Sequence, residues 1–165
     1  MSDPLHVLHA SLARRATSLA VHLALGALLV WIAVASSTMP FGWRAVLLGL
    51  GIVVLILARE GWCESAQALV LDASGLRQEN GDLIAPMDLI ASVDRGVFAF
   101  KPSNGFVLHL TRPIGPAWAP GMWWRTGRRV GVGGVTSGAG AKAMADTLAM
   151  MLAERDRRTG NSDGL

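Results

Sequence analysis

TSLAVHLALGALLVWIAVAS at residues 17–36 and WRAVLLGLGIVVLILA at residues 43–58 decide how this chain is built. A helix crosses the bilayer's hydrocarbon core, about 30 Å thick, with roughly 20 mostly apolar residues. The first stretch has this length with His22 as its only ionisable group, and the second is a nearly continuous apolar run. Residues 36–42 between them include Pro40, which cannot continue a helix. We therefore predict a transmembrane helical hairpin over residues 17–60, in a chain of α+β class.

Two other interpretations of the apolar stretches remain open. Both helices would fit the core of a soluble protein, although their lengths exceed those of ordinary core helices. The first would also fit a cleaved signal peptide with a weak processing site at Ala33-Val34-Ala35, but its apolar run is longer than a signal sequence needs and a second run follows at once. His22, as an ionisable group inside a predicted span, is a candidate functional residue without an assigned role.

Basic residues flanking the stretches predict their orientation. Arg14 and Arg15 precede the first and Arg59 follows the second, whereas Arg44 stands alone near the turn. Cytoplasmic segments carry an excess of arginine and lysine. We expect both termini in the cytoplasm of a bacterial cell and a multi-pass location in its inner membrane. The single cysteine, Cys63, excludes an intrachain disulfide and fits a reducing compartment.

The N-terminal residues 1–16 are predicted to be an amphipathic segment that lies on the surface as a helix. Asp3-Pro4 resembles a helix N-cap followed by proline at the first position. Leu5, Leu8 and Leu12 would then share one stripe. His6 and His9 are three residues apart, but two histidines without a third ligand make a poor metal site, so no metal is predicted.

After residue 65 the pattern becomes strand-like. Asn80-Gly81 is the strongest short hairpin signal, and it separates short runs at 76–79 and 82–85. Further strands are expected at 68–72, 89–94, 97–101, 106–111 and 130–132, and residues 112–129 are expected to form a loop rich in proline, glycine and tryptophan. A helix at 139–158 carries an apolar stripe of Met144, Leu148, Met151 and Leu152. Residues 159–165 are expected to be a flexible tail.

Short antiparallel strands followed by one amphipathic helix resemble the bacterial pleckstrin-homology-like (PH-like) domains. The matching segments are LRQENGDLI at 76–84, MDLIASVDRG at 87–96, VFAF at 97–100 and the late helix. The resemblance implies a cytoplasmic PH-like domain over residues 61–158, used for binding and assembly, with no catalytic residues. The tryptophan-rich loop is not part of that pattern.

Motifs for catalysis do not occur in the chain. The glycines at 131–134 lack the last glycine of a dinucleotide fingerprint, no GK[ST] follows them, and HExxH, GxSxG and CxxC do not occur either. We predict no enzyme and no cofactor. A site built from Asp88, Asp94 and His109 would have no supporting spacing.

Charge divides the region after the hairpin. Residues 60–94 hold seven acidic side chains and one basic one, whereas residues 95–145 hold seven basic and no acidic ones. The two halves either face each other or expose a basic surface to an acidic partner or anionic lipid. Nucleic acid is not an expected partner because the chain is tethered and its charge density is low.

The predicted working surface combines tryptophan, which suits binding hot spots and membrane interfaces, with arginine, which donates to phosphate or carboxylate. Its residues are Trp118, Trp123, Trp124, Arg125, Arg128 and Arg129. Alternatively the loop folds over the sheet and its tryptophans complete the core. We expect an accessory or assembly factor of an inner-membrane complex that binds lipids and a membrane protein; a sensor of anionic lipid surfaces and a small membrane enzyme are the alternatives.

Overall fold

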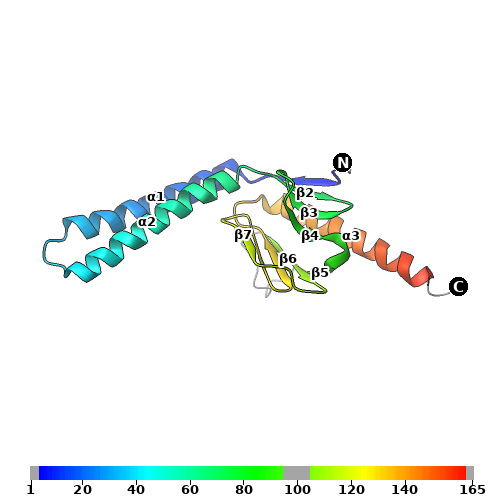
Figure 1. The fold of residues 1–165 in the computed structure, drawn as a ribbon. Helices are drawn as coiled ribbons and strands as arrows, with labels where there is room; N and C mark the ends of the chain where they lie inside the picture. Colours follow the sequence, from blue (N-terminus) through cyan, green and yellow to red (C-terminus); the bar gives the residue numbers. More distant parts are fainter. Residues whose placement is uncertain (1–3, 95–104, 163–165) are drawn as a thin grey trace.

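Two long antiparallel helices form one arm of the molecule, and strands with a third helix form the rest (Figure 1). The computed structural model describes residues 4–94 and 105–162. Helix α1 covers Leu12–Ala35 and α2 covers Phe41–Glu64. Both are long and apolar enough to cross a membrane, with a mean hydropathy of 2.2. At about 1.5 Å per residue, 24 residues extend about 36 Å, slightly more than a bilayer core.

Small residues form the seam between α1 and α2. The buried positions are Gly26 and Ala33 on α1 and Gly51 and Ala58 on α2, seven residues apart in each helix. A Cβ atom added at Gly26 would lie 2.6 Å from Leu55 Cδ2, so the glycine allows the close approach. Small residues at helix contacts are typical of packing inside membranes, where backbones approach closely.

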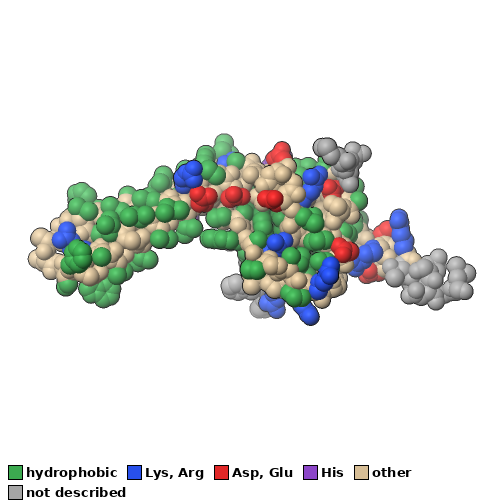
Figure 2. Space-filling view, viewed as in Figure 1, with side chains coloured by type: hydrophobic (Ala, Val, Ile, Leu, Met, Phe, Trp, Pro, Cys, Tyr) green, Lys and Arg blue, Asp and Glu red, His purple; other side chains and the backbone are tan. Residues whose placement is uncertain are grey.

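The outer sides of the hairpin are apolar and exposed. Only 11% of each apolar window is buried, whereas a core helix of a soluble protein is mostly buried. Figure 2 shows hydrophobic side chains along most of the visible side of the hairpin, and charged side chains gathered at its base and over the rest of the molecule. At the turn, Arg44 Nε donates to the carbonyl of Ala33 at 2.9 Å and so caps the end of α1.

Within the described residues the strands form two antiparallel sheets. The first has the order β1-β2-β3-β4, with β1 at His6–Leu8, β2 at Leu69–Asp72, β3 at Gly75–Gln78 and β4 at Leu83–Pro86. The second has the order β5-β6-β9-β8-β7, with β5 at Ile90–Asp94, β6 at Phe106–Leu110, β7 at Ala117–Ala119, β8 at Trp123–Thr126 and β9 at Arg129–Val132. A short 3-10 helix, Met87–Leu89, connects them. The predicted Asn80-Gly81 hairpin is confirmed as the β3–β4 connection, with Gly81 at φ +99°.

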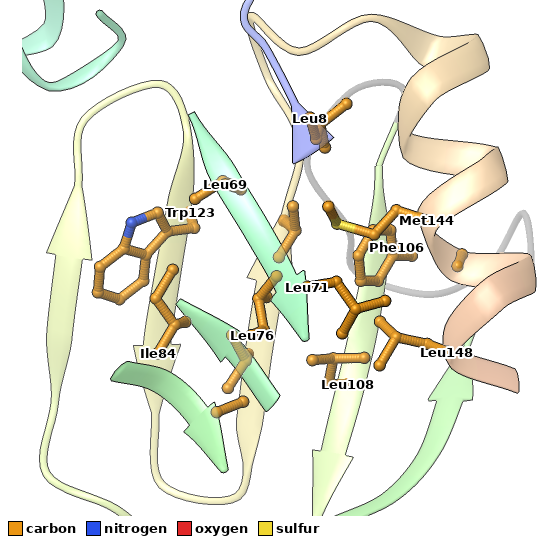
Figure 3. Packing of buried hydrophobic residues seen from close by; sticks show 14 of the residues in the cluster. Leu8, Leu69, Leu71, Leu76, Ile84, Phe106, Leu108, Trp123, Met144 and Leu148 are labelled. Atoms are coloured by element: carbon orange, nitrogen blue, oxygen red, sulfur yellow. The ribbon is translucent and has the colours of Figure 1, made fainter. Parts of the chain in front are cut away.

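The hydrophobic core lies between the two sheets and under helix α3, Gly138–Ser162 (Figure 3). Phe106 and Leu108 come from the second sheet and Leu71 from the first. Met144 and Leu148 of α3 are fully buried against them, as the predicted apolar stripe requires. The helix is longer than the sequence predicts, because it continues through residues 159–162, which the sequence pattern places in the tail.

The predicted N-terminal helix is wrong. Residues 6–8 form β1, which pairs with β2 and places Leu8 opposite Leu69. Leu8 is 1% exposed, whereas Leu5 and Leu12 are exposed, so the three leucines do not share a face. Val7 is exposed and Leu8 is buried, which is the alternation of a strand. The edge of β2 also offers unpaired backbone N–H and C=O groups, which a strand can pair with and a helix cannot.

The predicted tryptophan-rich loop also differs, because it contains the β7–β8 hairpin and the whole β8–β9 turn. Its prolines and glycines suggested irregular structure, but they lie outside the paired residues. The predicted strand at 97–101 and the turn after it lie outside the described residues up to residue 104.

Candidate binding face beside the helical hairpin

Strand β8 directs alternate side chains to opposite faces of the second sheet. Trp123 pairs with Val132 and Arg125 with Val130, whose side chains belong to the core. Trp124 and Thr126 therefore point to the other face. The predicted surface residues are thus divided by the pleat of one strand.

Trp123 belongs to the core and not to a surface. Its side chain is 7% exposed and packs in the cluster with Leu69 and Ile84 (Figure 3). Its indole Nε1 is buried without a hydrogen-bond partner among the described residues. For Trp123 the structure therefore matches the alternative in which the tryptophans complete the core. Strand β8 is a central strand, so a side chain on its inner face is covered by the core.

Arg125 holds the two sheets together. Its Nε donates to the Gly115 carbonyl at 2.8 Å, and Nη1 donates to the carbonyls of Ile84 at 2.8 Å and Leu83 at 3.2 Å. Strand β4 is an edge of the first sheet and leaves carbonyls without a partner strand. The guanidinium group is therefore occupied by backbone acceptors, which favours a structural role for Arg125.

Trp118 and Trp124 form a pair on the outer face of the second sheet. They lie directly opposite each other in the β7–β8 register. Trp118 is 63% exposed, and Trp124 is partly buried. A Cβ atom added at Gly131 would lie 2.4 Å from the indole of Trp124, so that ring rests directly on the glycine backbone of β9. Because Gly131 has no side chain, the indole ring of Trp124 can pack directly on its backbone, which holds that ring in place.

Basic residues lie on the same side of the second sheet as the tryptophan pair, farther from the hairpin. Arg129 pairs with Thr126 on one side and with His109 on the other. Arg128 and Arg129 are exposed, and within the described residues neither guanidinium group makes a hydrogen bond or ion pair. His109 Nε2 lies 3.9 Å from Asp94 Oδ2. We call Trp118, Trp124, Thr126, Arg129 and His109 the outer face.

The hairpin base, where α1 begins at Leu12 and α2 ends at Glu64, holds the outer face in position relative to the helices. Arg14 Nη1 donates to the Thr136 carbonyl at 2.9 Å, and Ser11 N donates to the Val135 carbonyl at 2.9 Å. On the other helix, Gly61 lies beside Pro120 of the β7–β8 turn. The edge strand β7 therefore lies next to the base of α2, and the exposed Trp118 beside it.

The β8–β9 turn lies at the opposite end of β8 from the hairpin base. Thr126 is three residues beyond Trp123, which corresponds to up to about 10 Å along a strand. The Debye length at physiological salt is about 8 Å. Arg128 and Arg129 thus lie beyond the end of β8 that faces away from the hairpin base, and the length of the strand is comparable to the distance over which salt screens a charged surface.

A second group of polar residues gathers at the hairpin base, which sequence reasoning did not bring together. Arg15 lies over the ring of Trp62, with 4.5 Å between the guanidinium carbon and the ring centroid. His22 Nδ1 lies 2.7 Å from the Ser18 carbonyl, and because a carbonyl only accepts, this nitrogen is the donor. These residues and Trp118 line one cavity. No spacing rule connects residues 15, 62 and 118, so only the fold reveals this group.

Ionisable groups elsewhere have structural partners. Burial alone would raise the pKa of Asp72, but hydrogen bonds from Ser74 and Arg77 outweigh it and hold that pKa below its usual value. Among the described residues no group of three or more histidine, cysteine or acidic side chains is placed to hold a metal ion. Asp88 is exposed on the connecting 3-10 helix and is not grouped with His109.

Comparison with known proteins found no matching family model, no matching curated protein and no matching solved structure.

Proposed function

We propose that this chain is a non-enzymatic binding protein of the bacterial inner membrane, anchored by α1 and α2, that acts as an accessory or assembly factor of a membrane protein complex. The observation that carries the binding role is the outer face. It combines the exposed Trp118, the neighbouring Trp124 packed on Gly131, and Arg129, which has no partner among the described residues, and this is the composition of a protein-binding hot spot.

Three observations support the anchoring part of the proposal. The hairpin helices have the length and apolarity of spanning helices, their outer sides are exposed, and glycine and alanine form their seam. Arg14 and Arg15 lie in the first turn of α1 and Arg59 lies near the end of α2, whose exit is on the same side as the sheets. Under the positive-inside rule this side is cytoplasmic.

The pairing of β1 with β2 adds an argument that the residues alone did not offer. Strand β1 precedes α1 and β2 follows α2, and both lie in one sheet. Both ends of the hairpin must then lie on one side of the bilayer, as two crossings require. Cleavage after residues 33–35 would remove β1 and the buried Leu8, which weighs against a signal peptide.

A relationship to PH-like domains is part of the proposal. Two antiparallel sheets enclosing a core, with a C-terminal helix packed on it, support the likeness. The insertion of the helical hairpin between β1 and β2 and the added β7–β8 hairpin are the departures from it.

A protein partner is favoured over a lipid surface for the outer face. The arginines that would read anionic headgroups lie at the end of β8 away from the hairpin base. The length of β8 from Trp123 to Thr126, up to about 10 Å, is comparable to the Debye length of about 8 Å, so salt weakens the attraction of these arginines to charge at the hairpin base. A protein that stands on the same membrane can contact the tryptophan pair and both arginines at once.

Co-purification of the full-length chain in mild detergent tests this function. We expect a stoichiometric membrane-protein partner whose recovery falls at least about tenfold in Trp118→Ala with Arg129→Glu, because hot-spot truncations cost about 2 kcal/mol or more. Met150→Ala, which removes an exposed apolar side chain of α3, is the control and should retain the partner. Equal recovery with the double variant and the control would contradict the proposed face.

A further inference from the structure

We propose that the cavity at the hairpin base binds the headgroup and first acyl carbons of one anionic phospholipid. This inference rests on the proposed membrane crossing of α1 and α2, but not on the protein partner. The cavity has a volume of about 210 Å³ and lies between the two helices and the β7–β8 turn. Its walls are formed by Arg15, Ser18, Leu19, His22, Leu57 and Trp62 from the helices and by Trp118 and Pro120 from the sheet side.

Arg15 supplies a fixed cation at this cavity. Its Nε donates to Ser65 Oγ at 2.9 Å and its Nη2 donates to the Trp62 carbonyl at 2.9 Å. The planar group also stacks on the Trp62 ring. Within the described residues Nη1 makes no hydrogen bond, so a rigid, charged donor remains for a phosphate oxygen. Arginine held in this way loses little conformational freedom when it binds a phosphate.

Depth along α1 matches the layers of a phospholipid. His22 lies seven residues after Arg15, which is about 10 Å farther toward the turn. The polar end of the cavity, at Arg15 and Ser65, is therefore at the level of headgroups when the hairpin spans. The walls at Leu19 and Leu57 lie deeper, at the level of the glycerol and the first acyl carbons.

Apolar surface continues from the cavity toward the bilayer centre. Leu50 precedes Leu57 by seven residues, or about two helical turns, and is exposed. Leu23 follows Leu19 by one turn on α1 and is exposed as well. An acyl chain that leaves the cavity therefore meets apolar side chains of both helices. A free phosphate would use Arg15 alone, and the continuous apolar path commits the site to a lipid.

Exposed tryptophans border the site in a way that suits the membrane interface. Trp62 is half-exposed under the guanidinium group, and Trp118 is exposed at the sheet side of the cavity. Amphipathic indole rings gather at the headgroup level of membranes. The site thus combines an apolar floor, a cationic end and an aromatic rim, which is the pattern an anionic phospholipid complements.

Native mass spectrometry of the full-length chain, released from nanodiscs, tests the site. With phosphatidylglycerol mixed into phosphatidylcholine, we expect one retained phosphatidylglycerol, bound about tenfold more tightly than phosphatidylcholine. Both lipids carry the phosphate that Arg15 would contact, but the choline cation of phosphatidylcholine would repel the guanidinium group and offset part of that attraction. Arg15→Gln should abolish this preference. Ser18→Leu should abolish it as well by filling the cavity while leaving the guanidinium group in place, and it keeps the test valid if Arg15→Gln fails to fold.

The matched control is Arg59→Gln, because Arg59 is an exposed arginine of the hairpin base that does not line the cavity. It should retain the bound phosphatidylglycerol. Equal loss in Arg59→Gln and Arg15→Gln, or equal retention of the two lipids by the unmodified chain, would overturn the site. Displacement of the lipid by excess soluble glycerol phosphate would also overturn it, because the phosphate alone would then account for binding. Arg129 does not line the cavity, so loss of the protein partner in Arg129→Glu alone should leave this lipid count unchanged, and the two proposals then fail separately.

Discussion

Asp72 shows how one buried carboxylate stabilises the first sheet. It accepts from the Ser74 amide at 2.8 Å and from Arg77 Nε at 2.8 Å. Because these bonds favour the ionised form, the pKa of Asp72 is lower in the folded chain than in the unfolded one. Its contribution to stability is therefore complete above the unfolded value of about 3.9 and is lost as the pH falls through the folded value.

We expect Asp72→Asn to lower the free energy of unfolding by about 2 kcal/mol at pH 7, the usual size of a charge-assisted hydrogen-bond loss. Below about pH 4 the unmodified chain loses the same contribution, so the difference between the two should shrink. Denaturant unfolding in detergent at pH 7 and pH 3 measures it. Asp88→Asn, at an exposed carboxylate, is the control. A difference that grows toward low pH would refute the assignment.

The tryptophans of the β7–β8 hairpin differ in what they do for the chain. Trp123→Ala empties a core position and should cost about 3–5 kcal/mol of unfolding free energy. Trp118→Ala removes an exposed ring and should stay within about 0.5 kcal/mol. Thermal unfolding of both variants in detergent provides the comparison. Equal destabilisation would mean that Trp118 also packs in the core.

At the scale of elements, the helix seam depends on two glycines that touch across it. A Cβ atom added at Gly51 would lie 2.9 Å from Val30 Cγ2 and 3.2 Å from the Gly26 carbonyl. Nothing lies within 4 Å of the same atom at Gly49, two residues earlier on α2. Gly51 and Gly49 therefore provide a test substitution and a matched control on the same helix.

Gly51→Leu should force α1 and α2 apart and lower the melting temperature, because overpacking costs about 1–3 kcal/mol. Gly49→Leu should leave the melting temperature nearly unchanged. Thermal unfolding of the full-length chain in one detergent gives both values. A loss with Gly49→Leu that matches the loss with Gly51→Leu would show that the seam is not where the structure has it.

Much of the element order could be predicted from local patterns. The apolar stretches give α1 and α2, Asn80-Gly81 gives the β3–β4 hairpin, and the stripe through Met144 and Leu148 gives α3. Strand β1 could not be predicted, because its partner β2 lies some 60 residues later and three residues carry too little pattern. Strand β7 is also only three residues long, and for that reason its pattern could not be recognised in the sequence.

The predicted binding residues were selected by residue type, which carries no information on orientation. Trp123 is buried, and Arg125 donates to backbone carbonyls of the other sheet. Which residues of a strand face outward depends on its register with β9, and no local feature of 112–129 sets that register. The group at Arg15, Trp62 and Trp118 depends on tertiary packing alone.

At the scale of the whole molecule, the helical hairpin is an insertion into a sheet. Strands β1 and β2 pair across it, so a fragment that starts after α2 lacks Leu8 and the strand that covers the edge of β2. The predicted boundary at residue 61 would therefore not give a complete folding unit. Because β1 and β2 meet in one sheet, the hairpin must return to the side from which it leaves.

Labelling of engineered cysteines in intact cells tests the anchored arrangement most directly. In a Cys63→Ser background, Ser37→Cys places a thiol in the turn of the hairpin and Asp88→Cys places one beside the sheets, both at exposed positions. An impermeant maleimide should label Ser37→Cys in cells with a permeabilised outer membrane, and should label Asp88→Cys only after the inner membrane is disrupted. Labelling of Asp88→Cys in intact cells, or protection of Ser37→Cys, would contradict two crossings with cytoplasmic sheets.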